Sequence, residues 1–289
     1  MRKLAGAGLA TAGAAVALLL LGAGSSGAAA SDGAGHALIG EARRGSVTVR
    51  IAPAVDVVVS GARAAGRPIV VIDPGHGGRD PGAVSVSGAV AEKQLTLALA
   101  RELRDRLVER GRVRVALTRD SDRYLTLEER AGVARGLGAS LFLSLHMDSA
   151  PNPLARGASV YSLSDVASDA EAARFAAAEN AGGGVGIADG SVRSMLSDLA
   201  LRSLMTASAD LASRLVRKSA ARVEMRPEPH RFATFHVLRR AQAPAVLFEA
   251  GYVSNAEDEL LLRSPEHRAA LVAGLAETIE ADVAARSRR

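Results

Sequence analysis

The sequence predicts an α/β domain: a single twisted, mostly parallel sheet flanked by helices, with a helical insert between two of its strands. The apolar runs "PIVVID" (68–73) and "SLFLSLH" (140–146) are typical of strands buried on both faces. Between them, residues 91–111 repeat leucine every four positions, as a helix with one buried stripe does. Strand, helix and strand in this order indicate a βαβ unit, and hence a parallel sheet covered by helices.

The same alternation continues to the carboxyl end of the chain. A capping box of Thr126 and Glu129 predicts the start of a helix, and Ser264 followed by Pro265 predicts the cap of the last helix. Further strands are expected at "RVRVALT" (112–118), "ASVYSLS" (158–164) and the start of "APAVLFEAGYVSN" (243–255). Residues 165–227 differ in composition. They are rich in Ala and Ser, and their apolar residues have helical spacing on either side of the glycine-rich "AGGGVGIADGS".

The first 66 residues are expected to lie outside this domain, which spans 67–289. Residues 1–30 combine a basic start, an apolar stretch and small residues up to Ala30, which is typical of a secretory signal peptide. An uncleaved membrane anchor is the alternative, but the stretch is rich in Gly and Ala and ends in residues suited to signal peptidase. Residues 31–66 are expected to be a linker with one hairpin, or the remnant of an N-terminal region. We therefore expect a secreted or periplasmic protein without a membrane span after cleavage.

Composition limits the chemistry of the chain. It contains no cysteine, which excludes thiol catalysis and cysteine-ligated zinc, so any metal must be held by His, Asp or Glu. The formal charge of +5 falls to +3 without Arg2 and Lys3. Such a balance suits an anionic surface such as a bacterial wall, but it is too weak to indicate nucleic-acid binding.

The loop "VVIDPGHGGRDPGA" (70–83) has three interpretations: a phosphate-binding glycine loop, a tight turn with an incidental histidine, or a turn that presents a metal ligand. The first is disfavoured, because neither G-x-x-x-x-G-K-[ST] nor G-x-G-x-x-G occurs and an aspartate lies at each end. The glycines are better explained as permitting a sharp turn that presents His76.

Four side chains that can bind metal or move protons are expected at one edge of the sheet. His76, His146 and Glu249 each follow or end a predicted strand, and Glu92 opens the helix that leaves the first loop. Ligands of open α/β sheets gather beyond the carboxyl ends of the strands. A single histidine or glutamate of this kind is more often structural, but four at one edge predict a functional site.

Zinc chemistry accounts for this set. A catalytic zinc takes three N or O ligands and leaves one position open, and His76, Glu92 and His146 supply a suitable shell. Glu249 has the right chemistry to take a proton from water and return it to a leaving amine. The motif H-E-x-x-H is absent, which excludes thermolysin-like proteases.

Five motifs in order resemble a known family. They are "VVIDPGHGGRDPGA", "EKQLTLALA", "LTRDSDRYLTLEERAGVAR", "SLFLSLHMDS" and "APAVLFEAGYVSN", and they resemble those of the zinc-dependent N-acetylmuramoyl-L-alanine amidases, the AmiC-type cell-wall hydrolases. The resemblance covers about residues 67–289. It implies a peptidoglycan substrate, Zn²⁺ on His76, Glu92 and His146, and Glu249 as the catalytic carboxylate. The sequence departs from the family pattern at Met147-Asp148 and at Ala250, which removes no ligand.

Several other residues have two possible roles or none at the metal. Asp73 and Asp80 are candidates for orienting the metal-binding histidines, or they serve only the turn. The other four histidines, His36, His230, His236 and His267, are expected to be structural or exposed.

Residues 165–227 resemble the regulatory insert of division-associated amidases. In those relatives, an acidic side chain occupies the open position on the zinc until a LytM-type activator displaces it. The candidates for that side chain are Glu179, Asp189 and Asp198; alternatively, the insert grips substrate or simply packs.

Two other functions stay open at this point. A non-catalytic peptidoglycan-binding or activator module would keep the fold but lose a ligand or Glu249, and the sequence retains all four residues. A zinc peptidase that cuts within the stem peptide would use the same machinery, and only its products would differ.

Overall fold

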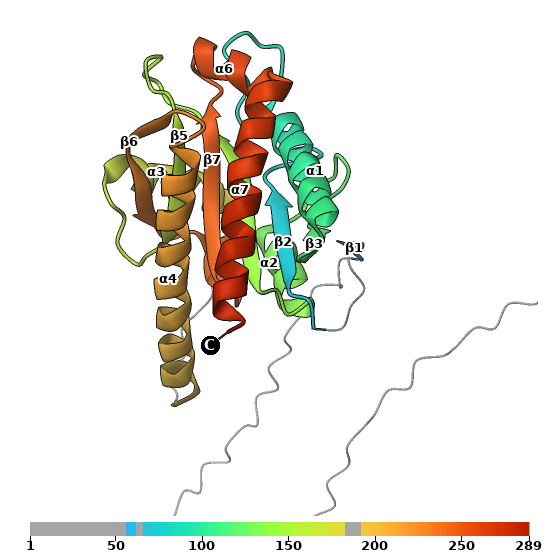
Figure 1. Ribbon diagram of the computed structural model, residues 1–289. Helices are drawn as coiled ribbons and strands as arrows, with labels where there is room; N and C mark the ends of the chain where they lie inside the picture. Colours follow the sequence, from blue (N-terminus) through green and yellow to red (C-terminus); the bar gives the residue numbers. More distant parts are fainter. Residues whose placement is uncertain (1–55, 62–65, 183–191, 289) are drawn as a thin grey trace, which may run out of the picture. The chain divides into compact units, whose positions relative to one another are not determined.

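The computed structural model describes residues 56–61, 66–182 and 192–288 (Figure 1). The expected signal peptide, most of the segment 31–66 and the candidate Asp189 lie outside the described residues. Within the described part of the chain, no helix is long and apolar enough to cross a membrane.

The centre of the fold is a seven-stranded sheet in the order β1-β3-β2-β4-β7-β5-β6. Its strands are β1 (Val59–Gly61), β2 (Ile69–Pro74), β3 (Arg114–Leu117), β4 (Leu141–Asp148), β5 (Ala158–Leu163), β6 (Met225–Ala233) and β7 (Ala245–Tyr252). Strands β3, β2, β4 and β7 are parallel neighbours, and β6 runs parallel to β5. Only the pairs β1·β3 and β5·β7 of this sheet are antiparallel, which confirms the predicted mostly parallel sheet.

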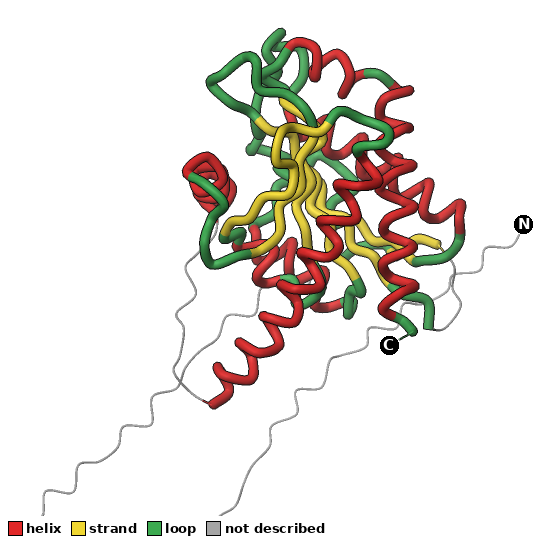
Figure 2. Tube along the Cα trace, turned by 60° about the vertical axis from the view of Figure 1, so that its left-hand side comes forward, coloured by secondary structure: helices red, strands yellow, loops and turns green. Residues whose placement is uncertain are grey.

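Helices cover both faces of the sheet (Figures 1 and 2). On one face lie α1 (Glu92–Arg110), α4 (Val192–Ser219) and α7 (Pro265–Arg286); on the other lie α2 (Leu127–Gly136), α3 (Ala170–Glu179) and α5 (His236–Arg240). A short 3-10 turn (Asn180–Gly182) follows α3, and α6 (Ala256–Arg263) follows β7.

Two apolar clusters explain why the strands carry continuous apolar runs. Val70 and Ile72 of β2 pack in the cluster under α1, α4 and α7, whereas Val71 packs in the cluster under α2, α3 and α5. Successive strand residues point to opposite faces, so a strand covered on both sides needs apolar residues at every position. The helix boundaries also follow the sequence signals: Thr126 and Glu129 form the capping box of α2, and Ser264 caps α7.

One prediction on the sheet needs correction. Met225–Ala233, expected at the end of the helical insert and just beyond it, forms strand β6. Pro227 and Pro229 hide this strand from a pattern search, and the fold tolerates them because β6 lies at the end of the strand order. The described part of the linker contributes β1, which pairs with β3, and the first run of the expected hairpin, 46–53, lies outside the described residues.

The described residues of the segment 165–227 pack into the same core as the rest of the domain. They supply α3, all of α4 and the start of β6, and together they connect β5 to its parallel neighbour. Leu211, Ala212 and Leu215 of α4 are fully buried in the core. Deleting the whole segment would therefore remove core packing, so tests of regulation require point substitutions.

Candidate metal centre

The loop after β2 presents His76 in a conformation that L-residues seldom adopt. His76 has φ 59° and Gly77 has φ 125°. A Cβ at Gly82 would lie 2.6 Å from both Glu92 Oε2 and the His76 ring, so this position requires glycine. Unfavourable backbone conformations of this kind persist where the surrounding structure enforces them, often at functional sites.

Two buried arginines hold the backbone of this loop in its unfavourable conformation. Arg119 donates to the carbonyl oxygens of Pro74 (3.0 Å) and Gly75 (2.7 Å). Arg130 donates to the carbonyl oxygens of Pro74 (2.7 Å) and His76 (2.7 Å). Neither arginine was predicted as part of the site, although each lies inside a conspicuous motif, "LTRDSDRY" or "LTLEERAGVAR". An arginine at the end of a strand or in a buried helix stripe is the signal that could have found them, because it must have a partner there.

Glu92, at the start of α1, contacts both histidines. Its Oε2 lies 3.1 Å from His76 Nε2, and its Oε1 lies 3.1 Å from His146 Nδ1. The backbone N–H groups of Ala83 and Met147 donate to the same two oxygens, at 2.9 Å each. The carboxylate is thus fixed between the first loop and β4.

His146 and Glu249 are direct neighbours across strands β4 and β7. Glu249 is fully buried, and neither of its carboxylate oxygens has a hydrogen-bond partner within the described residues. Burial raises the pKa of Glu249 well above its usual range, and the nearby acids Asp148, Glu92 and Glu179 add to that effect. The structure therefore brings together all four residues that the sequence predicted at this edge.

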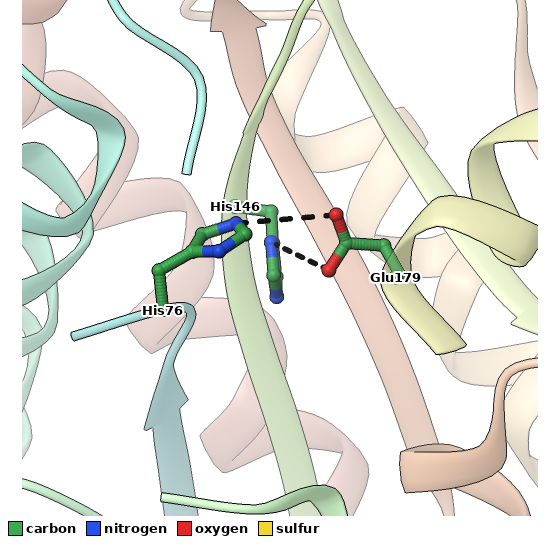
Figure 3. Close-up of side chains that lie close together, drawn as sticks. All are labelled: His76, His146 and Glu179. Atoms are coloured by element: carbon green, nitrogen blue, oxygen red, sulfur yellow. Dashed lines mark ion pairs between the residues drawn. The ribbon is translucent and has the colours of Figure 1, made fainter. Parts of the chain in front are cut away.

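A third carboxylate, that of Glu179 at the end of α3, points at the two imidazoles (Figure 3). Its oxygens lie 3.9 Å from His76 Nε2 and 3.5 Å from His146 Nδ1. One ligand atom from each of these three residues lies within 4.8 Å of the others, which is close enough to hold one metal ion. A cavity of about 230 Å³ adjoins them, lined also by Tyr124 and Phe235.

The charges around His76 favour a cation. Burial alone would lower the pKa of His76, but Glu92, Glu179 and Asp80 outweigh burial and raise the pKa to about 9. The two histidines likewise lower the pKa of Glu92, against the effect of its burial. His76 Nε2 is buried and makes no hydrogen bond within the described residues, although Glu92 is near. Two imidazole nitrogens beside carboxylates form a donor set that suits zinc.

The two aspartates of the first loop differ in their contacts. Asp80 Oδ2 lies 3.0 Å from His76 Nδ1, which turns Nε2 of that ring toward Glu92. Asp73 instead accepts hydrogen bonds from Thr118 (2.6 Å), Arg130 (2.9 Å) and Ser144 (3.0 Å). Asp80 is thus placed to orient the His76 ring, whereas Asp73 binds the arginine that holds the loop.

The remaining candidates lie elsewhere in the described structure. Asp198 is exposed on α4. His230 bonds to two serines, Ser162 and Ser213, and His267 lies in the first turn of α7. His236 begins α5, and its backbone N–H donates to Asn180. Of the two candidate inhibitory acids that the structure describes, Glu179 reaches the histidines and Asp198 does not.

Comparison with known proteins assigns the fold and the motifs to one family. Residues 70–281 match the family Amidase_3, described as N-acetylmuramoyl-L-alanine amidase. The chain belongs to this amidase family. Its relatives in Escherichia coli and Salmonella typhimurium are named N-acetylmuramoyl-L-alanine amidases, so this is a family of enzymes.

Individual relatives agree with that assignment. N-acetylmuramoyl-L-alanine amidase AmiA of Escherichia coli (strain K12) is 33% identical over 223 residues, which cover 75% of this chain and 76% of AmiA. AmiC of Neisseria meningitidis serogroup B is 32% identical over 207 residues, covering 70% of this chain but 49% of AmiC. The chain thus spans three quarters of one relative and about half of the other.

Solved amidase structures have the same fold. The catalytic domain of CwlV from Bacillus (Paenibacillus) polymyxa var. colistinus superposes with a TM-score of 0.55 at 27% identity, covering 73% of this chain and 96% of that domain. AmiC2 of Nostoc punctiforme gives a TM-score of 0.55 at 25% identity, covering 78% of this chain and all of AmiC2, 100%. These similarities confirm the predicted family and fold class.

Proposed function

We propose that the protein is a zinc-dependent hydrolase that cleaves the amide bond between N-acetylmuramic acid and L-alanine in peptidoglycan. The convergence of His76, Glu92 and His146 next to Glu249, in a chain of this amidase family, supports the proposal most strongly. We place Zn²⁺ on the first three residues and proton transfer on Glu249. When bound, zinc would polarise the scissile carbonyl and make water a better nucleophile near neutral pH.

Residues of the chain perform the remaining steps. Asp80 holds the His76 ring so that Nε2 points at the centre, and Glu92 is fixed by two backbone N–H groups. Glu249 takes a proton from the attacking water and delivers it to the nitrogen of the leaving L-alanine as the C–N bond breaks. Its free oxygens and its raised pKa suit a group that must gain and then lose a proton.

We further propose that Glu179 keeps the enzyme inactive in this structure. Its carboxylate faces the same two nitrogens that Glu92 contacts, on the side of the cavity. A substrate carbonyl would need that space, so α3 must move before substrate binds. We expect a partner of the LytM type to move it, which would couple cleavage to wall remodelling and daughter-cell separation.

The location of the protein belongs to the same proposal. Peptidoglycan lies outside the cytoplasmic membrane, and residues 1–30 have the composition of a cleavable signal peptide. We propose export to the periplasm or the medium, with residues 67–289 as the catalytic domain. The residual positive charge would favour approach to an anionic wall.

The test is mass spectrometry of the products released from purified sacculi by the zinc-loaded mature protein. We expect stem peptides that begin with a free L-alanine amino group, more from Glu179→Ala than from the parent. Glu249→Gln should lower the rate by about 10²–10⁴-fold while the zinc content is unchanged. Glu109→Gln, at an exposed position of α1, is the matched control.

The products also separate the rival functions. Peptides cut at an internal bond would indicate a zinc peptidase and refute the amidase. Zinc-loaded protein that binds sacculi but releases nothing, even as Glu179→Ala and with a LytM-type activator present, would indicate a binding module.

A further inference from the structure

A second, larger cavity lies beside the metal centre. Its volume is about 970 Å³, and α3 forms one of its walls through Glu171, Arg174, Phe175 and Ala178. These four residues share one stripe of the helix. Ala178 lines both this cavity and the one at the histidines, so α3 is the partition between them.

The opposite wall belongs to the sheet and carries polar groups. Asp148 and Tyr252 are register partners on β4 and β7, two and three residues beyond His146 and Glu249. Arg226 of β6 donates to the Tyr252 hydroxyl at 2.6 Å. Asp148 is 4% exposed, and its Oδ2 meets no donor of the described residues at full hydrogen-bond geometry, although the nearby Tyr252 hydroxyl favours the charged form of this carboxylate. A buried carboxylate oxygen without a partner is costly unless a ligand supplies a donor.

Helix α3 places an acid on the arginine of this wall. Glu171 Oε1 and Oε2 lie 3.2 Å and 3.1 Å from two nitrogens of the Arg226 guanidinium, a two-point contact. Two residues before, Asp169 caps α3 and pairs with Arg231. Helix α3 therefore places the Glu179 carboxylate against the two histidines and the Glu171 carboxylate against Arg226. Movement of α3 would free the histidines and Arg226 at the same time.

We propose that this cavity is the subsite for the stem peptide, that Arg226 binds a carboxylate of the peptide there, and that Glu171 occupies Arg226 in its place in this structure. The inference rests on the proposed function, and it adds that α3 imitates the substrate at two positions. A guanidinium matches a carboxylate through two parallel hydrogen bonds, which is the contact that Glu171 makes.

The chemistry of the substrate fits both walls. The second residue of a stem peptide is a D-glutamate joined through its γ-carboxyl, so its α-carboxylate is free to pair with Arg226. The amide N–H groups of an extended peptide can donate to Asp148 Oδ2. Because Asp148 and Tyr252 continue the strands that carry His146 and Glu249, a peptide that leaves the reaction centre along the sheet edge would reach this wall.

The test measures binding by metal-free protein, so it does not depend on catalysis. Calorimetry would compare the tripeptide L-Ala-γ-D-Glu-L-Lys with its analogue in which the glutamate α-carboxylate is an amide. The protein for this comparison is the double variant Glu171→Gln, Glu179→Gln, which removes the carboxylates that contact Arg226 and the two histidines. We expect this double variant to bind the acid peptide about tenfold more tightly than the parent, and about tenfold more tightly than it binds the amide.

Adding Arg226→Gln should abolish that preference, and adding Arg226→Lys should retain part of it. Arg222→Gln is the matched control, because Arg222 also pairs with a glutamate elsewhere on the surface: its Nη2 lies 3.0 Å from both carboxylate oxygens of Glu277. A double variant that binds neither peptide, or a preference that survives Arg226→Gln, would overturn the inference. If the preference holds but sacculi are not cleaved, the proposed function fails instead.

Discussion

The Glu92 carboxylate joins the two imidazoles of the site, with Oε2 at 3.1 Å from His76 Nε2 and Oε1 at 3.1 Å from His146 Nδ1. Each oxygen also accepts a backbone N–H, from Ala83 or from Met147. One side chain thus fixes the spacing of two histidines that lie 70 residues apart in the sequence. A carboxylate held in this way keeps its geometry without a metal, and the site needs little rearrangement to take one.

Replacing Glu92 with Gln should therefore impair metal binding more than folding. The amide retains one acceptor oxygen, but its nitrogen faces a backbone N–H, which costs about 1–3 kcal/mol. The loss of a charged ligand should weaken zinc binding at least about tenfold. Zinc content after dialysis and the zinc-induced rise in melting temperature measure this. Glu109→Gln on the same helix is the control, and an unchanged zinc content in Glu92→Gln would contradict the assignment.

Glu179 and Asp198 provide a contrast between two acids of the segment 165–227. Glu179 faces the histidines, whereas Asp198 is exposed on α4. Glu179→Ala should speed hydrolysis by about tenfold or more, which corresponds to about 1.4 kcal/mol of removed competition. Asp198→Asn should have no effect.

The size of the substrate should matter in this experiment. Ion pairs of Asp169 and Glu171 with Arg231 and Arg226 still hold α3 over the cavity when Glu179 is gone. Glu179→Ala should therefore help a small soluble muramyl peptide more than it helps intact sacculi. Rates on both substrates check this, and equal rates for Glu179→Ala and the parent on both would exclude Glu179 as the inhibitory group.

The sequence could predict the four central residues because each is tied to a local signal. His76, His146 and Glu249 follow or end apolar runs, and Glu92 opens a helix, so the topology alone brings them to one edge. Prediction of the mostly parallel sheet succeeded for the same reason, since continuous apolar runs mark strands that helices cover on both faces.

Other features depend on contacts between distant segments, which no local pattern encodes. Glu179 could not be ranked above Asp198, because its position depends on how α3 docks through Ala172 and Ala176. Strand β6 was not predicted, because Pro227 and Pro229 disfavour a strand and are tolerated only at the edge of the sheet, where β6 lies. Arg119 and Arg130 act through backbone carbonyls of the loop, and a sequence does not show which carbonyls need a donor.

Asp73 and Asp80 should respond differently to the same change. Asp73 is 1% exposed and pairs with the buried Arg130, so Asp73→Asn should lower the free energy of unfolding by about 3–5 kcal/mol, as for a broken buried ion pair. Asp80 is partly exposed and bonds to His76, so Asp80→Asn should cost under about 1 kcal/mol yet weaken zinc binding about 10–100-fold. Denaturant unfolding without metal and zinc titration measure the two effects. A stability loss in Asp80→Asn as large as that in Asp73→Asn would refute the distinction.

His230 should make the metal-free fold sensitive to acid. It lies on β6, with Nε2 2.9 Å from Ser162 Oγ of β5 and Nδ1 3.3 Å from Ser213 Oγ of α4. Burial lowers the pKa of His230 below its usual value. The unfolded chain then binds more protons than the folded chain over the interval between the two pKa values, so stability must fall as the pH drops below about 6.5.

Replacing His230 with Gln keeps a neutral hydrogen-bonding group but removes the titration. The difference in free energy of unfolding between the parent and His230→Gln should be constant above about pH 7 and should shift in favour of the variant between about pH 6.5 and 5. Measuring both proteins in a chelator removes the contribution of metal release from His76 and His146. The parent and variant share His236 and His267, whose pKa values are also lowered, so these cancel in the difference. A difference that stays constant down to pH 5 would mean that His230 accepts its proton in the folded protein as easily as in the unfolded chain, through a rearrangement in which the two serines act only as acceptors.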